Sequence, residues 1–145
     1  MKKILLIVAL IATAITQHSF GQDSTKQSRL PQLLTYYYNI KNALVAANAA
    51  DAVSGAASFI KAVNGIDCKI ISVGNISTLV KDASRISGTT DIIKQRTYFA
   101  SFSINMAAVA KAVKLTDKPV YYAWCPMKKA YWLSSEKAIT NPYSR

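Results

Sequence analysis

Two sulfur-bearing side chains near the end of the sequence form its sharpest chemical feature. Cys125 and Met127 are separated only by Pro126. In an extended segment residues i and i+2 point to the same side, so a thiolate and a thioether project together while the proline stiffens the link. Sulfur ligands of this kind select Cu(I) over zinc or magnesium. The spacing therefore predicts a soft-metal site at Cys125 and Met127, with Met106 or Cys68 as a third ligand.

The same sulfur atoms allow two other interpretations. In the first, Met106 and Met127 fill gaps in a hydrophobic core and Cys125 is a small buried apolar residue. In the second, Cys68 and Cys125 form a disulfide, which an oxidising compartment would preserve and which stabilises by about 4 kcal/mol when unstrained. A bridge requires Cα atoms within about 7 Å of each other, which a sequence does not reveal, so all three interpretations stay open.

The chain lacks most of the side chains on which acid/base catalysis depends. Its single histidine is His18, inside the segment that we interpret below as a signal, and its single glutamate is Glu136. A cysteine nucleophile assisted by Lys128 or Lys129 has no third group to orient it. We therefore expect a protein that is not an enzyme.

The first 21 residues have the features of a secretory signal peptide. Lys2 and Lys3 precede a mostly apolar run over 4–16, and small residues lie before an expected cleavage site after Gly21. This run is shorter than the ~18 residues that cross a bilayer, and no later stretch is long and apolar enough to replace it. We expect a periplasmic or secreted protein without a membrane anchor.

Basic residues outnumber acidic ones, and removal of Lys2 and Lys3 lowers the formal net charge only from +11 to +9. The remaining cations are scattered singly, which is typical of a solvated helical surface. For an exported protein, other exported proteins or an acidic surface are more plausible partners than a nucleic acid. We therefore expect no nucleic-acid binding.

These side chains must be positioned by one small domain, predicted over 30–145 after a flexible polar leader at 22–29. Four segments repeat apolar residues every three or four positions, as amphipathic helices do. The first helix is expected to start near Pro31, the second at Asn48 with Asp51, and the fourth at Thr90. The four stripes are Leu30, Leu33, Leu34, Tyr37, Ile40, Leu44 and Ala47; Val53, Ala56, Ala57, Ile60 and Val63; Ile76, Leu79, Val80, Ala83 and Ile86; and Ile92, Gln95, Phe99, Phe102, Met106, Val109 and Val113. The pattern predicts a mainly α fold, an antiparallel up-down four-helix bundle.

Aromatic and β-branched residues after Pro119 predict a short C-terminal hairpin or extended flap, with strands near 120–124 and 131–133. The flap contains Trp124 and Trp132, whose rings are large enough to cover the open end of a bundle. In an alternative interpretation these aromatic rings contact another protein, and the domain is a metal-free structural or interaction module.

Several short motifs occur in a fixed order along the C-terminal part of the chain. They are Gln95-Arg96 with Phe99, Cys125-Pro126-Met127, Tyr131-Trp132-Leu133-Ser134 and Asn141-Pro142-Tyr143. This series resembles the exported bacterial family called domain of unknown function 3347. Members of that family stand alone in the periplasm or are joined to adaptor subunits of heavy-metal efflux systems. The resemblance implies a helical bundle, a setting of metal homeostasis with Cu(I) as the candidate ion, and efflux components as partners.

The resemblance also implies structural roles for residues in these motifs. Gln95 and Arg96 are expected to hydrogen-bond the backbone of the C-terminal flap, with Arg96 reaching carbonyls or Glu136, or alternatively binding an anion. Structural roles extend to the flap residues Trp124, Trp132, Asn141 and Pro142.

Two departures from the family pattern concern the predicted metal site. Many members have histidine before the C-P-M motif, where this chain has Trp124. The family usually continues after N-P-Y with a glycine, a methionine and a cysteine, whereas this sequence ends at Ser144-Arg145. The resemblance then implies that Cys125 is a free thiol or pairs with Cys68.

Overall fold

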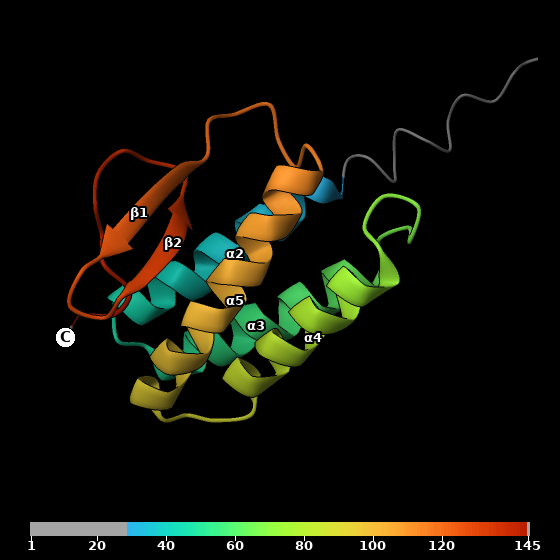
Figure 1. Ribbon diagram of the computed structural model, residues 1–145. Helices are drawn as coiled ribbons and strands as arrows, with labels where there is room; N and C mark the ends of the chain where they lie inside the picture. Colours follow the sequence, from blue (N-terminus) through green and yellow to red (C-terminus); the bar gives the residue numbers. More distant parts are fainter. Residues whose placement is uncertain (1–28, 145) are drawn as a thin grey trace, which may run out of the picture.

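The structure is a computed structural model that describes residues 29–144. The predicted signal peptide at 1–21 and nearly all of the leader lie outside the described residues. The elements are α2 (Leu30–Val45), α3 (Ala49–Asn64), α4 (Val73–Ser87), α5 (Ile92–Ala112), β1 (Tyr121–Cys125) and β2 (Ala130–Ser134). Successive helices pack side by side in alternating directions (Figure 1), which confirms the predicted four-helix bundle with a C-terminal hairpin.

Short polar residues begin the later helices because their side chains accept the first free backbone N–H groups. The Asn48 side chain accepts from the N–H of Asp51 at the start of α3, as predicted. At the start of α5 the expectation for Thr90 is wrong: the Asp91 carboxylate accepts from the N–H groups of Ile93 and Lys94. A carboxylate also interacts favourably with the positive end of the helix dipole, which explains why Asp91 caps in place of its neighbour.

The stripe predicted for α3 is wrong in part: Ala56 and Val63 are buried as predicted, but Val53 and Ile60 are only partly buried. Ala52, Ala56, Phe59 and Val63 are fully buried, whereas Ala57 is exposed. Helix α3 packs against both α2 and α4, so it is covered on two sides, and Gly55 lies against Ile40 of α2. In α5, by contrast, the predicted Gln95, Phe99, Phe102, Met106 and Val109 are all buried.

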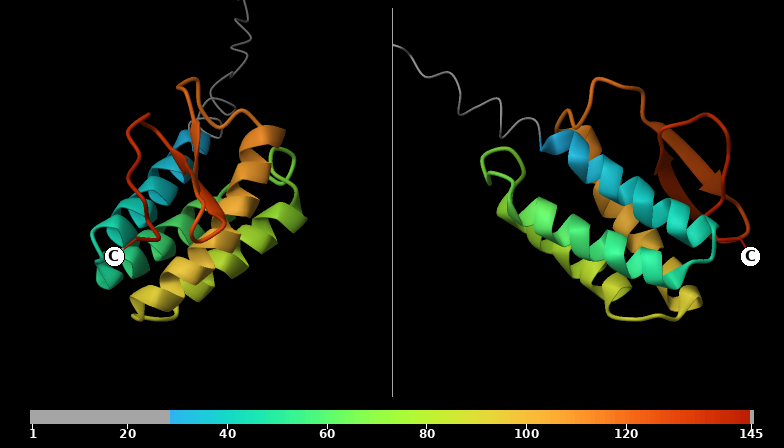
Figure 2. Two further views of the ribbon diagram at one scale, coloured as in Figure 1. Left: turned by 60° about the vertical axis from the view of Figure 1, so that its left-hand side comes forward. Right: turned by 180° about the vertical axis from the view of Figure 1, so that it is seen from behind.

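The hairpin covers the side of the bundle where α2 and α5 meet (Figure 2). Its strands pair antiparallel, with Tyr121 opposite Ser134 and Cys125 opposite Ala130. Trp132 is fully buried, so this ring does cover the bundle, but on the side next to α5 and not at the predicted open end. Tyr122 and Trp124 lie on the outer face and are 50% and 53% exposed.

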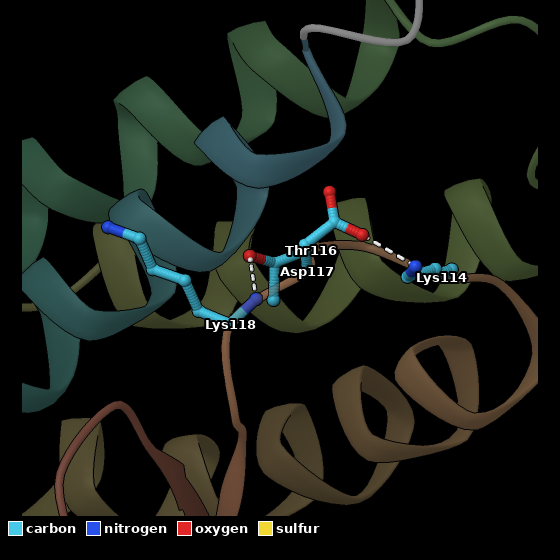
Figure 3. A network of polar contacts seen from close by, with 4 residues as sticks. All are labelled: Lys114, Thr116, Asp117 and Lys118. Atoms are coloured by element: carbon cyan, nitrogen blue, oxygen red, sulfur yellow. Dashed lines mark hydrogen bonds and ion pairs between the residues drawn. The ribbon is translucent and has the colours of Figure 1, made fainter.

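An exposed loop connects α5 to the hairpin (Figure 3). Lys114 Nζ lies 2.5 Å from Asp117 Oδ1, and the backbone N–H of Lys118 donates to Thr116 Oγ1 over 3.2 Å. Both charged side chains of the ion pair are more than three-quarters exposed, at 76% and 89%. Such a pair contributes little to stability, so the loop is shaped mainly by its local hydrogen bonds.

Candidate functional site

Cys125 lies at the end of β1, where the hairpin turn over 126–129 begins. The residue is only 5% exposed. Its Sγ atom accepts a hydrogen bond from Asn141 Nδ2 over 3.3 Å, while Asn141 Oδ1 accepts from the backbone N–H of Tyr143 over 2.9 Å. The Asn-Pro-Tyr motif therefore folds back onto the hairpin and places an amide donor against the thiol.

The surroundings of Cys125 favour its thiolate form. The hydrogen bond from Asn141 lowers the pKa of the thiol, and the backbone amide of Lys128 lowers it further. Burial acts in the opposite direction, and the amide of Met127 and the charge of Lys128 add smaller lowering effects. The net pKa lies below the ordinary value of a cysteine, so more thiolate is present near neutral pH.

Replacement of the amide donor tests this balance. In an Asn141→Asp variant the side chain keeps an oxygen for the N–H of Tyr143, but a carboxylate replaces the N–H donor that faces sulfur. We expect the pKa of Cys125 to rise, since a nearby negative charge disfavours the thiolate. In a Cys68→Ser background, alkylation of Cys125 by iodoacetamide at pH 7 should slow several-fold, and its pH profile should move to higher pH. Ser144→Ala is the control and should leave the profile unchanged; equal profiles for all three proteins would contradict the assignment to Asn141.

The other sulfur atoms lie in different environments. Met127 is in the hairpin turn and is 92% exposed. Met106 is completely buried in the core, as the alternative interpretation expected for it. Cys68 is exposed in the loop over 65–72, at the opposite end of the bundle from the turn over 126–129 (Figures 1 and 2). Both cysteines are free, so the disulfide interpretation is wrong, and Cys68 does not contribute a third ligand to Cys125.

Gln95 and Arg96 bind the ends of helices and not the flap, so the predicted partners are corrected. Gln95 Nε2 donates to the carbonyl oxygens of Thr89 over 2.7 Å and Ala49 over 3.1 Å. Arg96 Nη2 donates over 2.9 Å to the carbonyl of Leu44 at the end of α2. The last carbonyls of a helix lack intrahelical partners, which explains the bond from Arg96 to Leu44 and a longer one of 3.4 Å from Gln95 Nε2 to the carbonyl of Ile86 near the end of α4.

Tyr37 is a key structural residue that sequence reasoning assigned only to a helix stripe. Its hydroxyl is 2.6 Å from Ser103 Oγ on α5 and accepts from the backbone N–H of Leu133 on β2 over 3.0 Å. Its ring stacks on Phe99 at a centroid distance of 5.2 Å. One fully buried side chain therefore joins α2, α5 and the hairpin. The sequence did contain a sign of this role: a tyrosine at a core position has a buried hydroxyl, and a buried hydroxyl needs a hydrogen-bond partner.

Pro142 and Tyr143, the last residues of the Asn-Pro-Tyr motif, are buried against this core. The Tyr143 ring lies 5.9 Å from Trp132 and 6.0 Å from Phe99, measured between centroids, and its hydroxyl donates to the carbonyl of Tyr131 over 3.0 Å. Burial raises the pKa of Tyr143 to about 12, so the hydroxyl stays protonated and can donate at neutral pH. The motif thus fixes the loop that carries Asn141.

The fold and this site define a class of small helical-bundle domains in which a C-terminal hairpin covers the bundle and holds a buried cysteine. The description "protein of unknown function (DUF3347)" matches residues 33–118, more than half of the chain. The chain therefore belongs to this family, which confirms the resemblance seen in its motifs. The matched range begins within α2, contains all of α3, α4 and α5, and ends before Cys125. No curated protein and no solved structure matches the chain significantly.

Two further observations limit the types of site. Within residues 29–144, no three side chains from histidine, cysteine, aspartate and glutamate gather where they could bind a metal ion together. In the same part of the chain, none of the helices combines the length and apolar character that crossing a membrane requires.

Proposed function

We propose that this domain acts outside the cytoplasm as a non-catalytic carrier of Cu(I), with Cys125 and Met127 as its ligands, in metal homeostasis or efflux. The observation that carries the proposal is the contact between Asn141 Nδ2 and the Cys125 sulfur. Metal binding requires a deprotonated thiol, and this donor lowers the pKa of the thiol. A hydrogen-bond donor to a ligating sulfur also orients it for the metal.

The exposure of Met127 fits a site that takes up and releases its ion. Met127 is 92% exposed and lies two residues after Cys125, which is 5% exposed, so its thioether is open to an incoming ion while the thiol is held by Asn141. Cu(I) accepts low coordination numbers and soft sulfur ligands, so a partner protein could supply further sulfur during transfer. The signal-like segment over 1–21 and the family's link to efflux adaptors support the location and the partners in this proposal.

Titration of the reduced mature protein with Cu(I), in competition with a coloured Cu(I) chelator, tests the proposal. Cys68→Ser should bind one equivalent as the unaltered protein does. Cys125→Ser should lose that equivalent, because its hydroxyl is a poor ligand for a soft ion. Met127→Leu keeps the apolar side chain without the sulfur and should bind more weakly. Equal uptake by the proteins with and without Cys125 would refute the proposal.

A metal-free interaction module is the second candidate, favoured by the outer face of the hairpin. Tyr122 and Trp124 are 50% and 53% exposed, and they lie two positions apart on β1, on the same face of the strand. Exposed aromatic residues are common at protein interfaces. Under this alternative, Tyr122→Ser with Trp124→Ser would abolish association with an exported partner, while Cys125→Ser would leave that association unchanged.

A further inference from the structure

A small pocket lies between the first turns of α5 and the hairpin turn. It has a volume of about 180 Å³ and is lined by Ile93, Arg96, Thr97, Lys128 and Tyr143. Two of these five residues are cationic and none is acidic. Neither cation forms an ion pair with an aspartate or glutamate among residues 29–144. The pocket therefore concentrates positive charge that the described part of the chain does not neutralise.

Arg96 is anchored in this pocket with hydrogen-bonding capacity to spare. Its Nη2 atom donates to the carbonyl of Leu44, whereas its Nε atom is out of contact with solvent and has no partner within residues 29–144. A guanidinium group has five N–H donors in a rigid plane, which suits the paired oxygens of a carboxylate or phosphate. Because the guanidinium group is already held in place, the Arg96 side chain loses little conformational entropy when an anion binds.

The side chains, and not the end of the helix, provide the recognition. The carboxylate of Asp91 already accepts from the N–H groups of Ile93 and Lys94, so these are not free for a ligand. Lys128 is exposed in the turn and can approach an anion held by Arg96. The Tyr143 hydroxyl already donates to the carbonyl of Tyr131, so Tyr143 contributes apolar surface to the lining of the pocket and not a free donor.

We propose that this pocket binds a small oxyanion, a carboxylate or a phosphate, between the Arg96 guanidinium and the Lys128 ammonium group. The ligand would place its oxygens on the two cations and any apolar part against Ile93 and Tyr143. Charge-assisted hydrogen bonds to these donors supply the affinity. The pocket is lined by no sulfur atom, so anion binding can be tested without Cu(I).

Nuclear magnetic resonance of the ¹⁵N-labelled mature protein tests the site with inorganic phosphate and acetate as separate probes. Sodium chloride at matched ionic strength corrects for general screening. We expect at least one probe to shift the Arg96 Nε–H signal and the amide signals of Thr97 and Lys128, with saturation. A response to phosphate alone would indicate that the natural ligand is phosphorylated. A response to acetate alone would indicate a carboxylate ligand, and a response to both probes would indicate a general oxyanion site.

Two neighbouring lysines provide a matched pair of variants. Lys128→Ala removes a cation that lines the pocket and should weaken probe binding roughly tenfold. Lys129→Ala removes the same charge from the next residue, which does not line the pocket, and should bind as the unaltered protein does. Both side chains are exposed, so neither change should prevent folding. Equal affinities for the two variants, or no saturable shift with either probe, would overturn the proposal.

Discussion

Replacing Tyr37 by phenylalanine should lower the free energy of unfolding by about 2–4 kcal/mol, although only one oxygen atom is removed. That oxygen accepts from the N–H of Leu133 and bonds Ser103 Oγ, and all these groups are buried. Without it, a backbone N–H and a hydroxyl lose their partner in a place that water does not reach. A buried polar group left unpaired costs far more than the average hydrogen bond contributes.

Urea denaturation followed by circular dichroism measures this effect, and the adjacent tyrosine provides the control. Tyr38 is only half-buried, and its hydroxyl forms no hydrogen bond with another described residue. Tyr38→Phe should therefore change stability by less than about 0.5 kcal/mol. Ser103→Ala should cost about 1 kcal/mol, since the N–H of Leu133 keeps its acceptor. Similar costs for Tyr37→Phe and Tyr38→Phe would show that the hydroxyl does not join the hairpin to the helices.

The order and approximate ends of the helices could be predicted because both are local properties. Apolar spacing and the capping residue Asn48 both act within a few neighbouring residues. The phase of α3 could not be predicted, because alanine and glycine give little contrast between its faces and two helices pack on it. Phe59 is the one large side chain that fixes the buried side, at a centroid distance of 4.8 Å from Phe102.

The candidate site was predictable in composition but not in geometry. The sequence identified Cys125, Met127 and Asn141 as notable residues, yet the bond between Asn141 and sulfur joins residues 16 positions apart through an irregular loop. No periodicity encodes such a contact. The same applies to Arg96 and Lys128, which come from a helix and a turn and meet only because the hairpin packs on α5.

The two tryptophans of the hairpin should differ sharply in their contribution to stability. Trp132 is fully buried and packs edge-to-face on Tyr143, whereas Trp124 on the paired strand is 53% exposed. Trp132→Ala should lower the free energy of unfolding by about 3–5 kcal/mol, since it removes a large apolar contact and leaves a cavity. Trp124→Ala, the matched control, should cost less than about 1 kcal/mol.

A conservative change separates packing from hydrogen bonding at Trp132. Its indole Nε1–H is buried without a partner among residues 29–144, so Trp132→Phe removes an unpaired donor together with part of the ring. This variant should cost clearly less than Trp132→Ala, because the relief of an unsatisfied polar group offsets some lost contact. Urea denaturation measures the free energy of unfolding of Trp132→Ala, Trp124→Ala and Trp132→Phe. In Trp124→Phe the only tryptophan is Trp132, and acrylamide quenching of its selectively excited fluorescence should be weak in the folded protein and strong after unfolding. Strong quenching before unfolding would mean that the hairpin does not pack on the bundle in solution, and the positions of Asn141 and Lys128 around Cys125 would then lose their support.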